Sequence, residues 1–197
     1  MKSMSVALLT ALLSTALAVP AAQADWTLRG DDSSLSFVST KAGNVAEVHR
    51  FGELSGSVDR DGDVVVTIAI DSIDTGIPVR DERMLELLFE AGEYPTATLN
   101  ATVDLATVEA MAPGDSTELV TEAQLMVRDQ STNLTVYLQV TRLAPDRIQV
   151  VSRKPLIVNA GQLGLLGGVE KLREVAGLPS ISPAVPVTFI ATFERDS

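Results

Sequence analysis

Apolar and polar residues alternate along much of this chain, and this two-residue period restricts its fold more than any other feature. Successive side chains of a β-strand point to opposite faces, so each such segment is predicted to be a strand with one apolar side. Strands of this kind are typical of an antiparallel sheet with one face on the core and the other in water. The clearest apolar faces are Val64, Val66, Ile68 and Ile70; Leu119, Ala123, Leu125 and Val127; Leu134, Val136, Leu138 and Val140; and Val185, Val187, Phe189, Ala191 and Phe193.

The candidate strands follow one another at the spacing of an all-β barrel or sandwich. Turn-forming residues separate them, and Asp61-Gly62 is a strong hairpin signal. We expect a single barrel of about eight antiparallel strands, because closure removes the exposed edges of a sheet. The predicted strands are residues 26–29, 35–40, 48–58, 64–70, 96–103, 118–128, 134–143, 147–151 and 185–193.

Two segments break the strand pattern. Residues 80–89 place Met84, Leu87 and Leu88 on one helical face, which predicts a short helix after the fourth strand region. Residues 169–176 are predicted to form a second short helix near the C-terminus, whereas the glycines of residues 161–168 argue against helix before it. This second segment is either an apolar flap over one end of the barrel or a crossover that plugs it.

Residues 1–24 have the features of a secretory signal peptide. Lys2 precedes a short apolar stretch, and Ala22-Gln23-Ala24 fits the small-x-small cleavage pattern. The apolar stretch is shorter than the roughly 20 residues that a membrane-spanning helix needs, although an uncleaved anchor is the alternative. We therefore expect an exported protein in which residues 25–197 form one domain. The chain has no cysteine, so this domain is predicted to fold without disulfides.

The sequence offers little catalytic or metal-binding chemistry. His49 is the one histidine and cysteine is absent, so zinc of the usual type has too few ligands. A lone histidine in a strand is predicted to be a surface residue or one with satisfied hydrogen bonds. Residues 59–63 are similar to a calcium loop, but a hairpin turn explains them better. We expect no catalytic residue, metal or cofactor, and the net charge of −11 argues against a nucleic-acid partner.

Charged residues cluster around the first turn of the predicted helix. Asp74, Arg80 and Arg83 form a candidate polar mouth of the barrel. One interpretation is that these side chains grip the head of an amphiphile. The other is structural: Arg80 and Asp74 pin the loop to the barrel, and an exposed pair of this kind contributes about 0.2 to 1 kcal/mol.

The predicted inward faces are mostly Val, Ala, Leu and Thr with scattered Phe. Small residues leave space inside an eight-stranded barrel, and an apolar space would suit a long hydrocarbon chain, at about 0.8 kcal/mol for each buried CH₂ group. A plain packed core is the alternative, and composition does not separate the two. The predicted ligand-binding residues are Phe37, Phe51, Met84, Leu87, Leu88, Phe89, Leu99, Leu125, Leu138 and Phe189.

Two other functions stay open on these grounds. An enzyme that uses the barrel, such as a lyase or isomerase acting on a hydrophobic substrate, would need a carboxylate or His49 inside the cavity with a shifted pKa. A structural or interaction protein would instead have a filled barrel and an exposed apolar patch. The volume of the interior separates this last function from the other two.

Several motifs occur in a fixed order after residue 24. They are Ile73-Asp74-Thr75-Gly76, Arg80-Asp81-Glu82, Leu88-Phe89 and Tyr94-Pro95-Thr96-Ala97, with flanking blocks at residues 51–56 and 155–160. Together they resemble the YceI-like family of bacterial periplasmic proteins. The resemblance implies a lipocalin-like barrel that binds a polyisoprenoid or fatty-acid-like lipid, for transport or sequestration in the periplasm. It also implies a link to stress response, transient contact with a membrane or membrane protein, and a monomer or homodimer.

Overall fold

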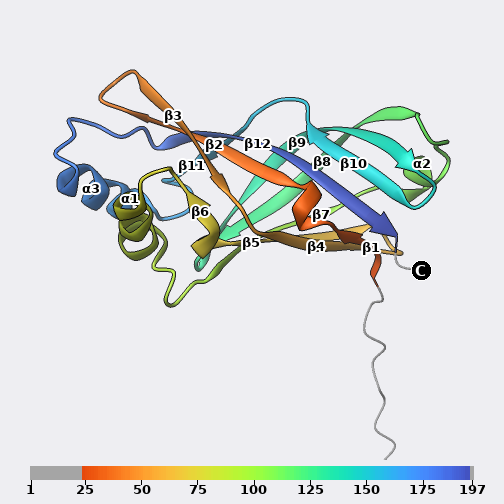
Figure 1. Cartoon of the computed structure of the whole chain (residues 1–197), viewed down its shortest axis with the longest axis horizontal. Helices are drawn as coiled ribbons and strands as arrows, with labels where there is room; N and C mark the ends of the chain where they lie inside the picture. Colours follow the sequence, from red (N-terminus) through yellow and green to blue (C-terminus); the bar gives the residue numbers. More distant parts are fainter. Residues whose placement is uncertain (1–23, 196–197) are drawn as a thin grey trace, which may run out of the picture.

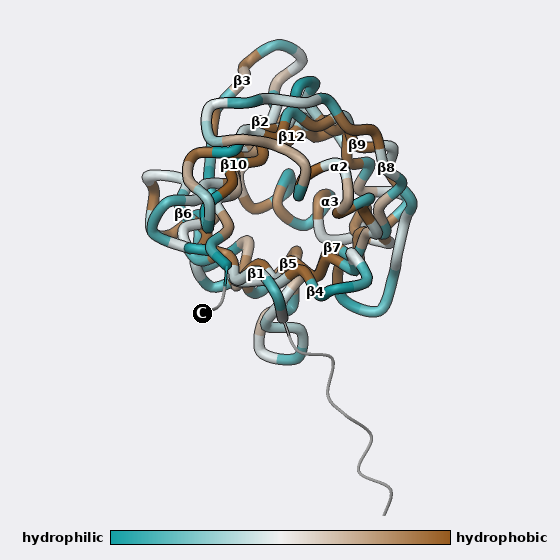
Figure 2. The backbone as a smooth tube through the Cα atoms, turned by 90° about the vertical axis from the view of Figure 1, so that its right-hand side faces the viewer, coloured by the Kyte–Doolittle hydropathy of each residue, from teal (hydrophilic) through white to brown (hydrophobic). Residues whose placement is uncertain are grey.

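The described part of the chain, residues 24–195 of a computed structural model, forms a closed antiparallel β-barrel (Figure 1). The ring runs β1, β4, β5, β7, β8, β9, β10 and β12, and β12 pairs with β1 to close it. Seen end-on, the strands surround one axis (Figure 2). The barrel predicted from the alternation is therefore confirmed. The predicted signal peptide, residues 1–24, lies outside the described residues except for residue 24.

The strands differ in length, and the two neighbours β8 and β9 are among the longest. The ring strands are β1 (Ala24–Leu28), β4 (Leu54–Asp59), β5 (Asp63–Ala69), β7 (Thr96–Thr102), β8 (Ser116–Val127), β9 (Gln130–Ala144), β10 (Arg147–Ser152) and β12 (Ala184–Arg195). Four further strands are β2 (Ser34–Lys41), β3 (Val45–Phe51), β6 (Ile73–Asp74) and β11 (Leu156–Asn159). β2 and β11 both pair with the first half of β12, so they lengthen the barrel at one end.

Three pairs of consecutive strands are each separated by a short kink, at a similar level of the barrel. β1 continues into β2, β3 into β4, and β5 into β6, and short 3₁₀ turns at Gly30–Asp32 and Ile70–Ser72 interrupt the first and third of these. The breaks lie side by side: the Gly52 N–H donates to the Ser72 carbonyl over 2.9 Å, and the Ala69 N–H donates to the Glu53 carbonyl over 3.1 Å.

The prediction of a single strand over residues 48–58 is wrong. The structure divides it at Gly52 and Glu53, which are exposed and belong to neither β3 nor β4. The alternation of the two halves also differs in phase. Phe51 of β3 and Leu54 of β4 both point inward although they are three residues apart. An odd separation between two inward residues requires a break in a two-residue period.

The four apolar faces named from the sequence all point into the barrel. Every residue of these faces lines one of the two cavities described below. The predicted register of β5, β8, β9 and β12 is therefore correct, and a slip of one residue would have placed each apolar face in water.

Short helices lie at both ends of the barrel (Figure 1). α1 (Pro78–Arg83) continues into η3 (Met84–Phe89), a π-helix, and these cover the predicted helix at residues 80–89. α3 (Leu166–Val175) packs against η3 at the same end, and α2 (Leu105–Glu109), which the sequence did not predict, lies at the other. None of the helices in residues 24–195 is long and apolar enough to cross a membrane.

Helix α3 begins earlier than expected. The sequence predicts helix only from residue 169, because glycines disfavour it, but the structure starts α3 at Leu166 and includes Gly167 and Gly168. Gly168 is buried against the backbone of η3, where a Cβ atom would lie 2.7 Å from the Leu87 carbonyl oxygen. Packing between the two helices therefore overrides the low helix propensity of glycine.

Candidate functional site

The interior of the barrel contains two neighbouring cavities. The deep cavity, of about 130 Å³, lies among the strands of the ring at the α2 end, and every residue that lines it is hydrophobic apart from Thr121. The mouth cavity, of about 420 Å³, lies at the end that α1, η3 and α3 cover. Leu35, Ile68, Leu99 and Phe189 line both cavities, so the two are successive sections of one interior. A solid core, the alternative left open by the sequence, is excluded.

Trp26 ends the deep cavity. Its ring is fully buried, and two guanidinium groups lie over it, with the Arg195 Cζ atom 4.5 Å and the Arg142 Cζ atom 5.4 Å from the ring centroid. Arg142 is itself buried and donates to the Val108 carbonyl of α2 over 3.2 Å. The stacked cations and α2 therefore close this end of the barrel.

The mouth cavity combines an apolar wall with a polar edge. Its hydrophobic residues come from the strands, from η3 and from α3. Its polar residues come from β2, β3, α1 and the segment before β12, and they are Ser39, Lys41, Glu47, His49, Arg80, Arg83 and Ser182. The interior is therefore apolar along its length and polar at one end, which is the polarity of an amphiphile.

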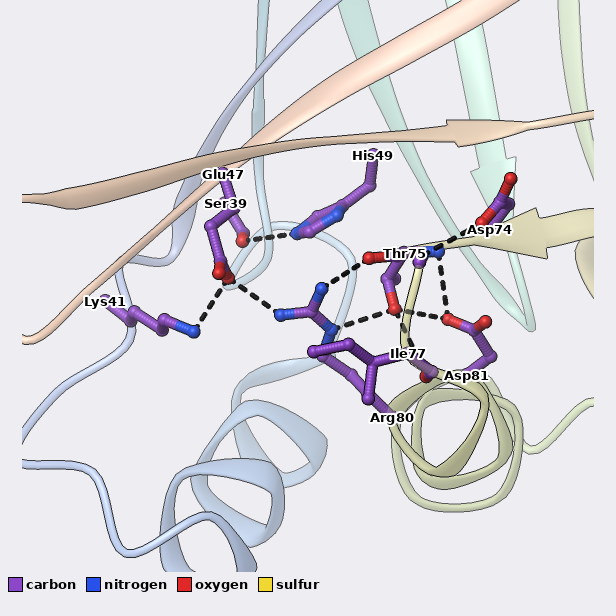
Figure 3. A network of polar contacts seen from close by, with 10 residues as sticks. Ser39, Lys41, Glu47, His49, Asp74, Thr75, Ile77, Arg80 and Asp81 are labelled. Atoms are coloured by element: carbon purple, nitrogen blue, oxygen red, sulfur yellow. Dashed lines mark hydrogen bonds and ion pairs between the residues drawn. The ribbon is translucent and has the colours of Figure 1, made fainter.

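Arg80 is the centre of the polar edge (Figure 3). Its guanidinium donates to Glu47 over 2.7 Å, to the Thr75 hydroxyl over 2.8 Å and to the Thr75 carbonyl over 2.6 Å. Asp81 in turn accepts from the Thr75 N–H over 3.0 Å. These bonds tie α1 to β3 and to the segment after β6.

Glu47 is shared between two cations. The Lys41 ammonium lies 2.7 Å from the same Glu47 oxygen that accepts from Arg80. The hydrogen bond from Lys41, supported by Arg80, lowers the pKa of Glu47 against the opposing effect of burial. Glu47 is therefore ionised at neutral pH, and it neutralises charge at the edge of the cavity.

His49 also belongs to this site, on the strand next to Ser39. Its side chain is 4% exposed and lines the mouth cavity, and the Nε2 atom lies 2.9 Å from the Ser39 hydroxyl. The ring packs edge-on against Phe37 with centroids 5.3 Å apart. Burial lowers the pKa of His49, and the charge of Arg80 lowers it further, so the imidazole is neutral at pH 7.

The prediction that His49 is a surface residue or a satisfied one is wrong. It is buried, and its Nδ1 atom has no hydrogen-bond partner within residues 24–195. The sequence does contain a signal for the burial of His49, because His49 and Phe51 are two residues apart and share the inward face of β3.

The structure brings together most of the residues predicted to bind a ligand. Leu138 lines the deep cavity, Leu99 and Phe189 line both, and Phe37, Phe51, Met84, Leu88, Phe89 and Leu125 line the mouth cavity. Leu87 lines neither, because the backbone at this position faces Gly168 of α3.

The three residues of the candidate polar mouth do not all lie at the cavity. Arg80 and Arg83 line the mouth cavity, whereas Asp74 does not. Asp74 accepts from Arg50 over 2.8 Å and from the Gly76 N–H over 2.9 Å, and the hydrogen bond from Arg50 lowers the pKa of Asp74. Arg80 is thus tied to Glu47 and Thr75 rather than to Asp74, and both residues hold the loop.

The described residues contain no group of three or more His, Cys, Asp or Glu side chains that could hold a metal ion. Residues 59–63 form the tight turn between β4 and β5, with the Asp59 carboxylate accepting from the Asp61 and Asp63 N–H groups over 3.0 and 2.9 Å. The hairpin interpretation of this loop is therefore correct.

A closed antiparallel barrel with an apolar interior and a polar opening defines a lipocalin-like fold. The chain belongs to the YceI-like family, since the YceI-like domain matches residues 26–193. No curated protein matches it at a significant level.

Solved structures agree with this assignment. A polyisoprenoid-binding domain from Saccharophagus degradans, implicated in plant cell wall breakdown, is 37% identical, with a TM-score of 0.86 over 88% of this chain and 100% of that one. BcnA from Burkholderia cenocepacia is 20% identical, with a TM-score of 0.63 over 84% of this chain and 98% of its own. The second similarity shows the shared fold only.

Proposed function

We propose that this protein binds a long-chain amphiphile, with a polyisoprenoid or fatty chain, inside the barrel and carries or sequesters it in the periplasm. The apolar interior that runs from the polar mouth to Trp26 is the observation that carries this proposal. Each CH₂ group moved from water into such an interior gains about 0.8 kcal/mol before ordering costs. The 37% identical domain, which binds polyisoprenoid, supports the same ligand class.

Native mass spectrometry of the protein expressed as residues 1–197 tests the proposal. We expect a non-covalent adduct of one long-chain molecule for each protein chain, removed by organic extraction and restored by adding the extracted lipid. The same spectrum reports export, because removal of residues 1–24 leaves a chain that begins at Asp25.

Two neighbouring residues of β8 provide a matched pair of variants. Leu125 is buried and lines the mouth cavity, whereas Met126 lies on the outer face and is 41% exposed. Leu125→Gln is expected to lose the adduct and Met126→Gln to keep it. Retention of the adduct by folded Leu125→Gln, or its loss from both variants, would contradict binding inside the barrel.

The Ser39 and His49 pair is the observation that favours an enzyme instead. Their 2.9 Å contact is that of a nucleophile and its base. A triad also needs a third group that orients the other ring nitrogen, and the His49 Nδ1 atom has no partner within residues 24–195. The nearby carboxylates are engaged, Glu47 by Lys41 and Arg80, and Asp81 by Thr75.

Binding without catalysis is therefore the better-supported function. Incubation with p-nitrophenyl palmitate distinguishes the two. We expect no ester hydrolysis above that of the Ser39→Ala variant, whereas turnover that Ser39→Ala abolishes would establish an esterase.

A further inference from the structure

The polar end of the mouth cavity holds a buried hydrogen-bonding atom that has no partner among the described residues. His49 is buried, its Nε2 atom is engaged with Ser39, and its Nδ1 atom has no partner within residues 24–195 although the ring lines the cavity. A buried polar atom without a partner costs free energy, and such atoms are uncommon in folded proteins. A ligand in the cavity can supply the missing partner.

The charges around His49 indicate what kind of partner fits. Lys41 and Arg80 both lie 2.7 Å from Glu47, and Arg80 also donates to Thr75, so these two cations are already committed. The imidazole is neutral at pH 7, since burial lowers its pKa. Arg83 also lines the cavity, but it is exposed. The buried part of the polar edge thus offers a neutral nitrogen and no unpaired cation.

We propose that the His49 Nδ1 atom forms a hydrogen bond with an uncharged oxygen, a hydroxyl or a carbonyl, at the head of the bound amphiphile. This inference rests on the proposed function and adds head-group recognition to it. If Ser39 donates to Nε2, the Nδ1 atom carries the proton and binds a carbonyl or hydroxyl oxygen. If Nε2 donates to Ser39, the Nδ1 atom accepts from a hydroxyl.

The position of His49 also orients the ligand. His49 lines only the mouth cavity, and the deep cavity beyond Leu99 and Phe189 is lined almost entirely by hydrophobic residues. A head held at His49 therefore directs the hydrocarbon chain toward Trp26. The reverse orientation would bury the polar head in a cavity whose lining is hydrophobic except for Thr121 and the Trp26 indole N–H.

The test compares chains of equal length that differ only in the head: geranylgeraniol, the corresponding aldehyde, the phosphate and the hydrocarbon without oxygen. Affinities are measured by competition against radiolabelled geranylgeraniol delivered from cyclodextrin. We expect the alcohol to bind about 3- to 10-fold more tightly than the hydrocarbon, the range that one net hydrogen bond gives. The aldehyde shares this gain only if Nδ1 carries the proton.

Three variants assign the effect to His49. His49→Phe keeps an aromatic ring against Phe37 but removes both nitrogens, so the preference for alcohol over hydrocarbon is expected to disappear. His49→Asn places an amide near the position of Nδ1 and is expected to restore most of the preference. Val48→Thr, at the adjacent residue that is 71% exposed, is the control and should keep the preference. Circular dichroism confirms that each variant is folded.

The possible outcomes separate this inference from the proposed function. If neither alcohol nor hydrocarbon binds, the proposed function itself fails. Equal affinities of alcohol and hydrocarbon for the wild type, or a preference for the alcohol that survives in folded His49→Phe, would overturn head-group recognition by His49. The proposed function would then still stand. Tighter binding of the phosphate than of the alcohol would also overturn head-group recognition by His49 and would point to the exposed Arg83 instead.

Discussion

Gly168 of α3 lies directly against Leu88 of η3, and a Cβ atom at position 168 would come within 2.8 Å of the Leu88 Cα atom. The absence of a side chain at this position lets the two helices that cover the mouth cavity approach each other closely. Gly167, one residue earlier, has no atom within 4 Å of the position its Cβ would take.

The two glycines should respond oppositely to alanine. Gly168→Ala is expected to lower the free energy of unfolding by about 1 to 3 kcal/mol, because the backbone of η3 has to move. Gly167→Ala should instead raise it by up to about 1 kcal/mol, because alanine favours a helix and meets nothing here. Urea unfolding of both variants measures the difference, and equal effects would contradict the tight contact.

Ala101 and Ala123 lie opposite each other in β7 and β8, and both line the deep cavity. Ala123→Phe should fill part of this space. We expect a long-chain alcohol to lose about tenfold or more in affinity, the equivalent of two excluded CH₂ groups, while decanol binds as before.

Val120→Phe is the matched control for this substitution, since Val120 lies on the same strand and is 61% exposed. It should leave both affinities unchanged. A uniform loss of affinity for long and short chains in Ala123→Phe would show that the deep cavity does not receive the end of the chain.

Arg80 and Arg50 both form ion pairs near the mouth but differ in exposure. The Arg80 side chain is 24% exposed and bonds to Glu47 and to the buried Thr75, whereas that of Arg50 is 66% exposed. Arg80→Met is expected to destabilise the protein by about 2 kcal/mol, because the Thr75 oxygens lose their donor.

Arg50→Met should cost less than about 1 kcal/mol, as exposed pairs do. Urea unfolding of both variants decides the point. Similar losses in the two variants would mean that the bonds of Arg80 contribute no more than a surface ion pair.

The pKa of His49 predicts a pH dependence of stability. Lys41, Glu47, Arg80 and Asp81 are the charged groups that act on it, and burial dominates, so the folded pKa lies below the ordinary value of 6.5. Below pH 6.5 the unfolded chain takes up a proton that the folded chain does not. The free energy of unfolding should therefore fall as the pH decreases through this value, until it reaches the folded pKa.

The His49→Asn variant isolates this effect, because it removes the titrating group. Urea unfolding between about pH 7.5 and pH 5.5 should show a smaller pH slope in the variant than in the wild type. Glu47 becomes protonated only below pH 4.5, because its pKa is lowered, so it does not contribute to the slope in this pH range. Identical slopes in the two proteins would contradict a buried, neutral His49.

Alternation predicts the antiparallel strands and their inward faces, and the barrel follows from the need to close the exposed edges of the sheet. The faces of β8 and β9 are long and regular, so their phase is unambiguous, and Leu125 and Leu138 lie inside as predicted. The break at Gly52 was missed because apolar residues continue across it. A change of phase between Phe51 and Leu54 marks it, but its structural cause is the kink shared with neighbouring strands, which are distant in sequence.

The polar site was harder to predict than the apolar interior. Hydrophobic lining follows from local periodicity, whereas the partners of Arg80 depend on how α1 meets β3. Glu47 lies 33 residues before Arg80 and was not recognised as its partner. The burial of His49 could have been inferred from its phase with Phe51, but its unsatisfied Nδ1 atom is a property of the packed structure.

The central claim is that a hydrocarbon chain lies along the barrel with its end near Trp26, the one tryptophan of the chain. Bromine quenches tryptophan fluorescence at contact, so two hexadecanols, brominated at the chain end or beside the hydroxyl, measure the orientation directly. We predict that the alcohol with the terminal bromine quenches Trp26 at saturation and that the other does not. Equal quenching, the reverse order, or no quenching by a bound terminal bromine would contradict the account.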